Sequence, residues 1–94
     1  MDEVLKRLSS HKGVEGSVII NYDGVPIRTS FDHDTTNQYA NMATLFTEKT
    51  VSTVKDLDQK DSVKTIRLRS KQNEVVIAPG KEYILVVVQK PQVE

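Results

Sequence analysis

The residues of this chain whose types could support chemistry are two acidic clusters and two histidines. Asp32-His33-Asp34 offers two carboxylates and an imidazole, donors that suit a divalent metal. His33 is the only nitrogen donor nearby, and aspartates at a helix start normally cap the helix and interact favourably with its dipole. We therefore expect this cluster to begin a helix, and we assign no metal site to it.

The second acidic cluster resembles half of a calcium-binding loop. It consists of Asp56, Asp58 and Asp61, but Lys60 interrupts it. The glycine and the terminal glutamate that such a loop needs are missing. We expect a solvated loop between two elements.

Motifs for nucleophilic catalysis and for cofactor binding are also missing. His11 and His33 lie on separate segments, and no Gly-x-Ser-x-Gly sequence accompanies them. Residues 13–16 contain two glycines instead of the three of a dinucleotide loop, and they precede a predicted strand rather than a helix. We predict no catalytic residue, no cofactor and no enzymatic activity.

Composition narrows the classes of partner and compartment. The 94 residues suffice for one domain, 1–94, and 13 basic residues balance 13 acidic ones. A basic cluster of Lys64, Arg67, Arg69 and Lys71 lacks interleaved aromatic residues, so we expect a charged sheet edge and no nucleic-acid binding. The acidic N-terminus has no long apolar segment, and the chain has no cysteine. We expect a cytoplasmic chain without a leader peptide or membrane contact.

The elements that must position these residues alternate between helices and hairpins. A short helix over residues 2–12 ends at Gly13, and a hairpin turns at Asp23-Gly24. Thr35 and Thr36 follow the acidic cluster as further helix caps, and one long helix then runs to about Leu57. Three strands are expected at residues 63–69, 74–78 and 83–90.

Strand composition predicts the order of the sheet. Val18-Ile19-Ile20 and residues 84–88 are apolar at successive positions, which is typical of central strands covered on both faces. Pro26 cannot donate a ladder hydrogen bond and marks one edge, while the basic strand 63–69 suits the other edge. We predict an α+β fold with one five-stranded antiparallel sheet in the order 2-1-5-4-3. The short helix covers one face and the long helix covers the other.

The long helix carries two kinds of side chain. Its larger apolar residues repeat at helical spacing and are expected to face the core: Tyr39, Met42, Ala43, Phe46, Val54 and Leu57. A neighbouring flank consists of small residues: Thr36, Ala40, Thr44, Thr47 and Val51. We expect this flank to allow the close approach of another helix, with Leu45 projecting elsewhere.

The sequence resembles the roadblock-type dynein light chains over residues 3–91. The matching strings are Lys12-Gly13-Val14-Glu15-Gly16, Asn21 with Gly24-Val25-Pro26-Ile27, residues 35–40, residues 67–74, Ala78-Pro79 and Gln89-Lys90-Pro91. The resemblance implies a roadblock/profilin-like fold and a non-catalytic subunit that forms a homodimer and binds the intermediate chain of a dynein motor. It also implies a cytoskeletal, microtubule-associated location, with cilium or flagellum left open. The alternative is a roadblock-fold adaptor or regulator of a small GTPase.

Two interaction surfaces follow as expectations. An unpaired strand edge can pair with an identical strand across a two-fold axis. The expected dimer interface comprises Ala40, Thr44, Leu45, Thr47, Val51, Val63, Thr65, Ile66 and Arg67. A partner helix is expected on the sheet face that the short helix covers poorly, since no third helix follows Pro91. The residues assigned to that surface are Val4, Leu5, Leu8, Ile84, Val86 and Val88.

Overall fold

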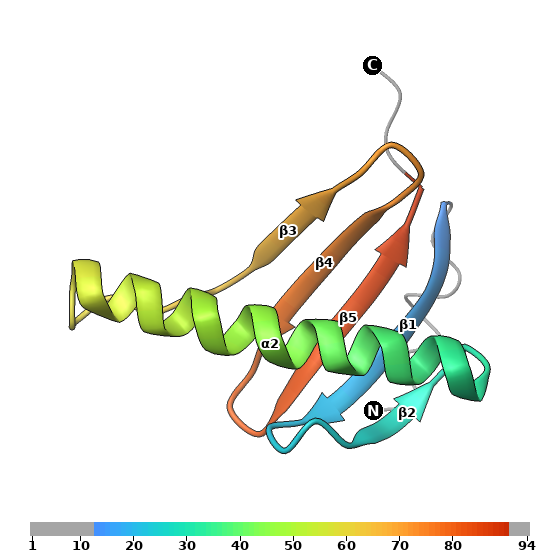
Figure 1. Ribbon diagram of the computed structural model, residues 1–94, viewed down its shortest axis with the longest axis horizontal. Coiled ribbons are helices and arrows are strands. Elements are labelled where there is room, and N and C mark those ends of the chain that lie inside the picture. Colours follow the sequence, from blue (N-terminus) through green and yellow to red (C-terminus); the bar gives the residue numbers. More distant parts are fainter. Residues whose placement is uncertain (1–12, 91–94) are drawn as a thin grey trace.

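A computed structural model describes residues 13–90 of the chain. Five strands and one long helix make up this part (Figure 1). Their bounds are β1 Val14–Asn21, β2 Pro26–Thr29, α2 His33–Leu57, β3 Ile66–Arg69, β4 Glu74–Pro79 and β5 Tyr83–Gln89. The expected helix over residues 2–12 lies outside the described residues.

The strands form one antiparallel sheet in the order β2-β1-β5-β4-β3. This confirms the predicted order, with Pro26 on one edge strand and the basic strand at the other edge. The register places Val18 opposite Val86 and Ile77 opposite Val86 on the two sides of β5. These side chains therefore lie on one face of the sheet, because residues directly opposite each other point the same way.

The β1–β2 turn depends on a glycine and on an asparagine side chain. Gly24 has φ 86°, a backbone conformation that favours glycine. The Asn21 side-chain oxygen accepts hydrogen bonds from the backbone N–H groups of Asp23 and Val25, both at 2.9 Å. The turn returns the chain through Pro26 into β2, which ends close to the start of α2.

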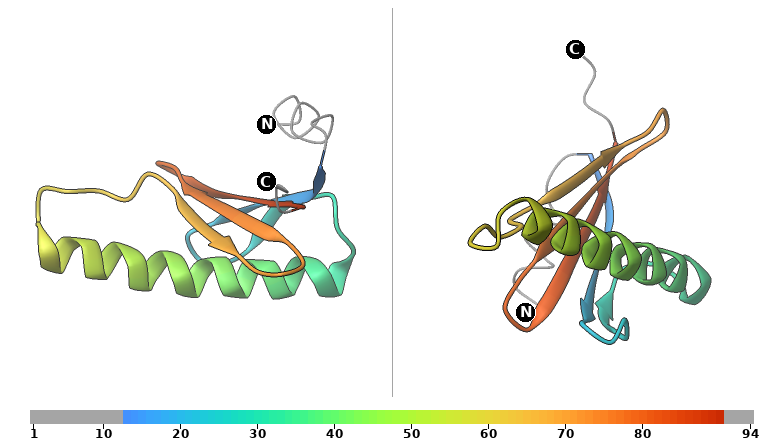
Figure 2. Two further views of the ribbon diagram at one scale, coloured as in Figure 1. Left: turned by 90° about the horizontal axis from the view of Figure 1, so that it is seen from above. Right: turned by 60° about the vertical axis from the view of Figure 1, so that its left-hand side comes forward.

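Helix α2 begins where the acidic cluster predicts. Asp32 is the N-cap, and its carboxylate accepts a hydrogen bond from the Thr35 backbone N–H at 2.8 Å. The helix contacts β1, β2, β4 and β5, so it covers one face of the sheet (Figures 1 and 2). The core lies between them and is built from Ala40 and Ala43 of α2 and from β-branched strand residues.

The rotation of α2 about its axis differs from the expectation. The buried helix residues are the small ones: Thr36, Ala40, Ala43 and Thr47. The larger residues expected in the core lie at the border or outside it, with Phe46 43% exposed and Leu57 84% exposed. Small side chains let the helix approach the β-branched surface of the sheet closely, and the larger ones are displaced to one side. The predicted core stripe is therefore wrong except at Ala43, although Tyr39 and Met42 pack against the core edge.

The third strand is shorter than predicted. It begins at Ile66, whereas the sequence indicated a strand from residue 63. Residues 63–65 lie outside regular structure and outside β-ladder pairing in this single chain. The segment 58–65 returns from the far end of α2 toward the level of the sheet (Figure 2).

Candidate functional site

The acidic clusters serve local structure. Hydrogen bonds from the Thr35 side chain and backbone, aided by the charge of His33, hold the pKa of Asp32 below its usual value. The ring Nε2 of His33 lies 3.2 Å from the Asn37 amide nitrogen on the next turn. Within residues 13–90, no three His, Cys, Asp or Glu side chains are grouped to hold a metal.

The second acidic cluster forms the turn after α2. Asp58 accepts a hydrogen bond from the Lys60 backbone N–H at 3.0 Å, and Asp61 accepts one from Ser62 at 2.8 Å. Asp56, Asp58 and Asp61 are all exposed. Two of the carboxylates thus accept backbone hydrogen bonds within the loop, as expected for a solvated connection.

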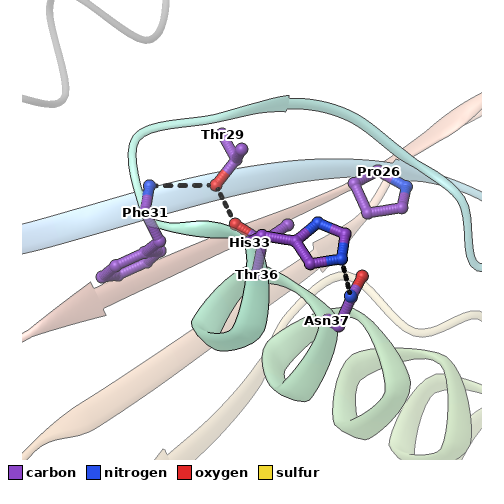
Figure 3. Close-up of a pocket in the computed structure, with 6 residues that line it drawn as sticks. All are labelled: Pro26, Thr29, Phe31, His33, Thr36 and Asn37. Carbon is purple, nitrogen blue, oxygen red and sulfur yellow. Dashed lines mark hydrogen bonds between the residues drawn. The ribbon is translucent and has the colours of Figure 1, made fainter.

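A hollow beside β2 and the start of α2 has a volume of about 320 Å³ (Figure 3). The hydroxyls of Thr29 and Thr36 lie 2.7 Å apart, and the Phe31 backbone N–H donates to Thr29 Oγ1 at 3.0 Å. His33 lines the same hollow and contacts Asn37. The arrangement pairs the two threonine hydroxyls with each other and the imidazole with the Asn37 amide.

The outer edge of β3 is the open edge of the described sheet without a proline. β3 pairs with β4 on one side, and in the described chain its other side has no strand partner. Arg67 lies 3.9 Å from the Glu74 carboxylate, which also accepts a hydrogen bond from the Gln89 amide at 2.6 Å. The basic cluster thus lies on a charged sheet edge, as the sequence predicts, and within residues 13–90 no strand occupies the outer side of β3, where another strand can pair.

Beside this edge, the second half of α2 extends past the sheet. Thr47 is the last fully buried residue of the helix, and residues 48–57, here called the overhang, continue beyond β3 in both views (Figures 1 and 2). The overhang ends in Leu57, which is 84% exposed. Leu45 and Phe46, just before it, are 66% and 43% exposed. Large apolar side chains on an uncovered helix are typical of an interaction surface.

The predicted dimer residues fall into three groups. Ala40 and Thr47 are buried against the chain's own sheet, so they cannot form the helix–helix contact expected of them. Thr44 is half-buried and its hydroxyl donates to the Ala40 carbonyl at 2.8 Å. The other predicted residues are partly or fully exposed and flank the β3 edge or the overhang: Leu45, Val51, Val63, Thr65, Ile66 and Arg67.

The predicted partner-binding strand residues lie on the wrong face for that role. Ile84, Val86 and Val88 are at most 1% exposed and pack in the core under α2. The opposite face of β5 carries Leu85 and Val87, since side chains alternate along a strand. Val4, Leu5 and Leu8, also assigned to that surface, lie outside the described residues.

A groove that the sequence did not predict lies between α2 and the β3–β4 turn. It is about 290 Å³ in volume, and its walls include Tyr39 and Met42 of α2 and Leu68 and Val75 of the sheet. Polar residues of the turn form its rim, including Ser70 and Asn73. The helical spacing of Tyr39 and Met42 is visible in the sequence, but the same spacing also suits core residues, and both were expected in the core.

In the described part of the chain, no helix has the length and apolarity needed to cross a membrane.

This architecture is similar to that of known proteins, both in sequence and in solved structures. The sequence model of the Roadblock/LC7 domain matches residues 1–90. A Roadblock/LC7 domain structure from Streptomyces avermitilis is similar with TM-score 0.88 and 14% identity, covering 100% of this chain and 81% of the other. The gliding protein MglB from Thermus thermophilus is similar with TM-score 0.79 and 14% identity, covering 95% of this chain and 70% of the other. Myxococcus xanthus MglB is similar with TM-score 0.78 and 13% identity, covering 98% and 76%. These identities carry the fold alone, while the match over residues 1–90 shows that the chain belongs to the Roadblock/LC7 domain family.

Proposed function

We propose that this chain is a non-catalytic scaffold subunit that forms a homodimer and, as a dimer, binds the intermediate chain of a dynein motor. The observation that carries the homodimer is the open β3 edge beside the apolar overhang of α2. The dynein assignment rests on the sequence strings shared with roadblock-type dynein light chains. As part of the motor complex, the protein would then support microtubule-based transport in the cytoplasm.

The proposed dimer joins the two β3 edges antiparallel across a two-fold axis. Two copies of the segment 63–67 would pair there, extending each five-stranded sheet into a ten-stranded one. Val63, Thr65, Ile66 and Arg67 lie at this edge, and Leu45 and Val51 belong to the adjacent helix. Pairing would also order residues 63–65 as a strand, which agrees with the β-strand sequence pattern from residue 63.

A proline substitution tests the edge without disturbing the chain's own ladder. Thr65 is exposed and precedes β3, so Thr65→Pro should leave the fold intact. It should raise the dimer dissociation constant at least tenfold, because proline has no backbone N–H to donate and does not fit a paired strand. Ile66→Pro should be more severe, since Ile66 also pairs with Ile77 within the chain. Sedimentation of the wild type as a monomer at tens of micromolar would refute the homodimer.

The proposed site for the intermediate chain is the sheet face opposite α2. Val76 and Leu85 lie on this face and are half-buried. An amphipathic helix from the partner could bury such residues against its apolar side. Leu85→Asp and Leu8→Asp should weaken binding to the intermediate chain while the dimer is retained. Unchanged affinity in both dimeric variants would place the site elsewhere.

The alternative is an adaptor or regulator of a small GTPase, and one experiment separates the two. A pull-down with the wild-type chain from lysate should recover dynein intermediate chain if the first proposal holds. Recovery of a small GTPase without intermediate chain would favour the alternative. Under either proposal the purified chain should hydrolyse neither nucleotides nor esters, and an activity lost on His33→Ala would refute the non-catalytic role.

A further inference from the structure

The groove between α2 and the β3–β4 turn is an apolar recess that this chain leaves open. Tyr39 and Met42 form its helical wall, and Leu68 and Val75 form its floor on the sheet. Tyr39, Met42 and Leu68 are only partly buried and pack against the core, whereas Val75 is a buried core residue beneath them. A single aliphatic side chain, brought in from above the β3 edge, would fit within its volume of about 290 Å³ and would contact its apolar walls.

The overhang carries Leu57 on the same side of the helix as the groove. At about 100° per residue, Tyr39, Met42, Phe46 and Leu57 fall within about 60° of one another around the axis of α2. Phe46 and Leu57 have large exposed fractions, 43% and 84%. One continuous helix flank thus contains a groove wall near its start and an uncovered leucine at its end.

The proposed two-fold axis brings these two ends together. Antiparallel pairing of β3 with its copy places the axis about 2.4 Å outside β3, half the spacing between neighbouring strands. The overhang begins just after Thr47, the last buried helix residue, and it continues past β3 (Figure 1), so we place the axis over the first turn of the overhang, near residue 49. Residues at equal distances on either side then face each other across the two helices. Met42 of one copy faces about residue 56 or 57 of the other.

We propose that the groove of each protomer receives the Leu57 side chain of a second copy of this chain. This inference rests on the proposed homodimer and adds to it a defined socket and its occupant. Leu57 then packs between Met42 and Leu68, and its exposed surface in the single chain becomes buried. The two-fold axis gives two identical sockets, one on each side of the paired β3 strands.

Engineered cysteines test the pairing directly, because the chain contains no cysteine of its own. Met42→Cys combined with Leu57→Cys should give a disulfide-linked dimer under mild oxidation. The two positions lie 15 residues apart on one helix, about 22 Å, so a bridge within one chain is impossible. The matched control combines Met42→Cys with Lys55→Cys, since Lys55 is exposed and projects from the opposite side of the helix. It should cross-link at least tenfold more slowly.

A second measurement avoids any change in the groove wall. Leu57→Asp should raise the dimer dissociation constant at least tenfold. Ser52→Asp adds the same charge to an exposed position on the far side of the overhang and should change it less than twofold. Leu57 is so exposed in the single chain that its replacement should leave the unfolding curve of the monomer unchanged.

The outcomes separate the inference from the homodimer. A dimeric wild type that forms no 42–57 cross-link, or that tolerates Leu57→Asp as well as Ser52→Asp, overturns the socket and leaves the homodimer standing. Equal cross-linking of the Lys55 control also overturns the socket. A monomeric wild type overturns both. Rapid cross-linking at 42–57 together with a weakened Leu57→Asp dimer establishes the occupant.

Discussion

A methyl group added to Gly16 would collide with the ring of Phe31. A Cβ built on Gly16 lies 2.3 Å from Cζ of Phe31 and 2.6 and 2.8 Å from its ε carbons. The ring cannot simply swing away, because its other face is stacked on Tyr39 with centroids 5.3 Å apart and planes inclined by 28°. Gly16→Ala therefore forces the pair off its packing position above β1.

The expected loss of stability follows from two contributions. Forcing an extra methyl group into a packed site typically costs about 1–3 kcal/mol. Loss of the aromatic stack accounts for about 0.5–1.5 kcal/mol of that range. The lower backbone entropy of alanine in the unfolded chain offsets about 0.4–1 kcal/mol. We expect Gly16→Ala to lower the free energy of unfolding by about 1–2 kcal/mol.

Removing the ring provides the matched background. In Phe31→Ala protein the space above Gly16 is empty, so adding Gly16→Ala should cost less than about 0.5 kcal/mol or should stabilise the chain slightly. Urea unfolding of wild type, both single variants and the double variant, at one protein concentration, gives the coupling energy. Equal effects of Gly16→Ala in both backgrounds would refute the collision as the reason for glycine at this position.

Three further predictions concern the β1–β2 turn, the N-cap of α2 and the hydrogen bond between Tyr22 and the Gly80 carbonyl in the β4–β5 turn. Gly24→Ala should lower the free energy of unfolding in urea by about 1–2 kcal/mol, because φ is 86° and the new Cβ would lie 3.1 Å from Thr44 Oγ1. Gly24→Asn should be less harmful, because asparagine adopts positive φ angles more readily than alanine. An unchanged unfolding curve for Gly24→Ala would contradict this prediction. The lowered folded pKa of Asp32 means that its stabilising contribution is complete above the unfolded value near 3.8 and disappears as the pH falls through the folded value. Wild type should therefore lose more stability than Asp32→Asn between about pH 6 and about pH 2.5, and parallel losses would argue against the cap. Tyr22→Phe should lower the free energy of unfolding by about 0.5–1.5 kcal/mol, because it removes the hydroxyl that donates to the Gly80 carbonyl. In a variant whose β4–β5 turn has been replaced, Tyr22→Phe should leave the free energy of unfolding unchanged.

Much of the fold could be predicted because single residues fixed the edges of the sheet. Pro26 excluded its strand from the centre, and Gly24 fixed the turn before it. Asp32 lies where the acidic cluster predicted a helix start. Each of these effects is local, so the sequence contains it without knowledge of tertiary packing.

The rotation of α2 could not be predicted in the same way. The large apolar stripe and the small-residue flank are neighbours on the helix surface, so both patterns have helical periodicity. Which one faces the sheet depends on how closely the helix can approach it. The spacing of Thr36, Ala40, Ala43 and Thr47 was the available signal, since small residues at such intervals allow close contact with β-branched strands.

The assignment of faces on β5 failed for a related reason. Residues 84–88 are apolar at every position, so alternation gives two equivalent choices of inward side. A polar pair could have decided between them. Gln89 bonds Glu74 on the face opposite α2, and counting back from Gln89 in steps of two reaches Val87 and Leu85 on that same face.

The length of α2 exceeds what is needed to cover the chain's own sheet. A helix of 25 residues is about 37 Å long, whereas five strands span about 19 Å between the axes of the outer two. Even with an oblique crossing, such a helix exceeds the width of the sheet beneath it. Its excess ends in Leu57, and the sheet edge that it passes is the one without proline. A helix too long for its own sheet and an edge open to a second strand both fit the proposed homodimer, in which a second copy of the chain would cover the helix end and pair with the edge at once.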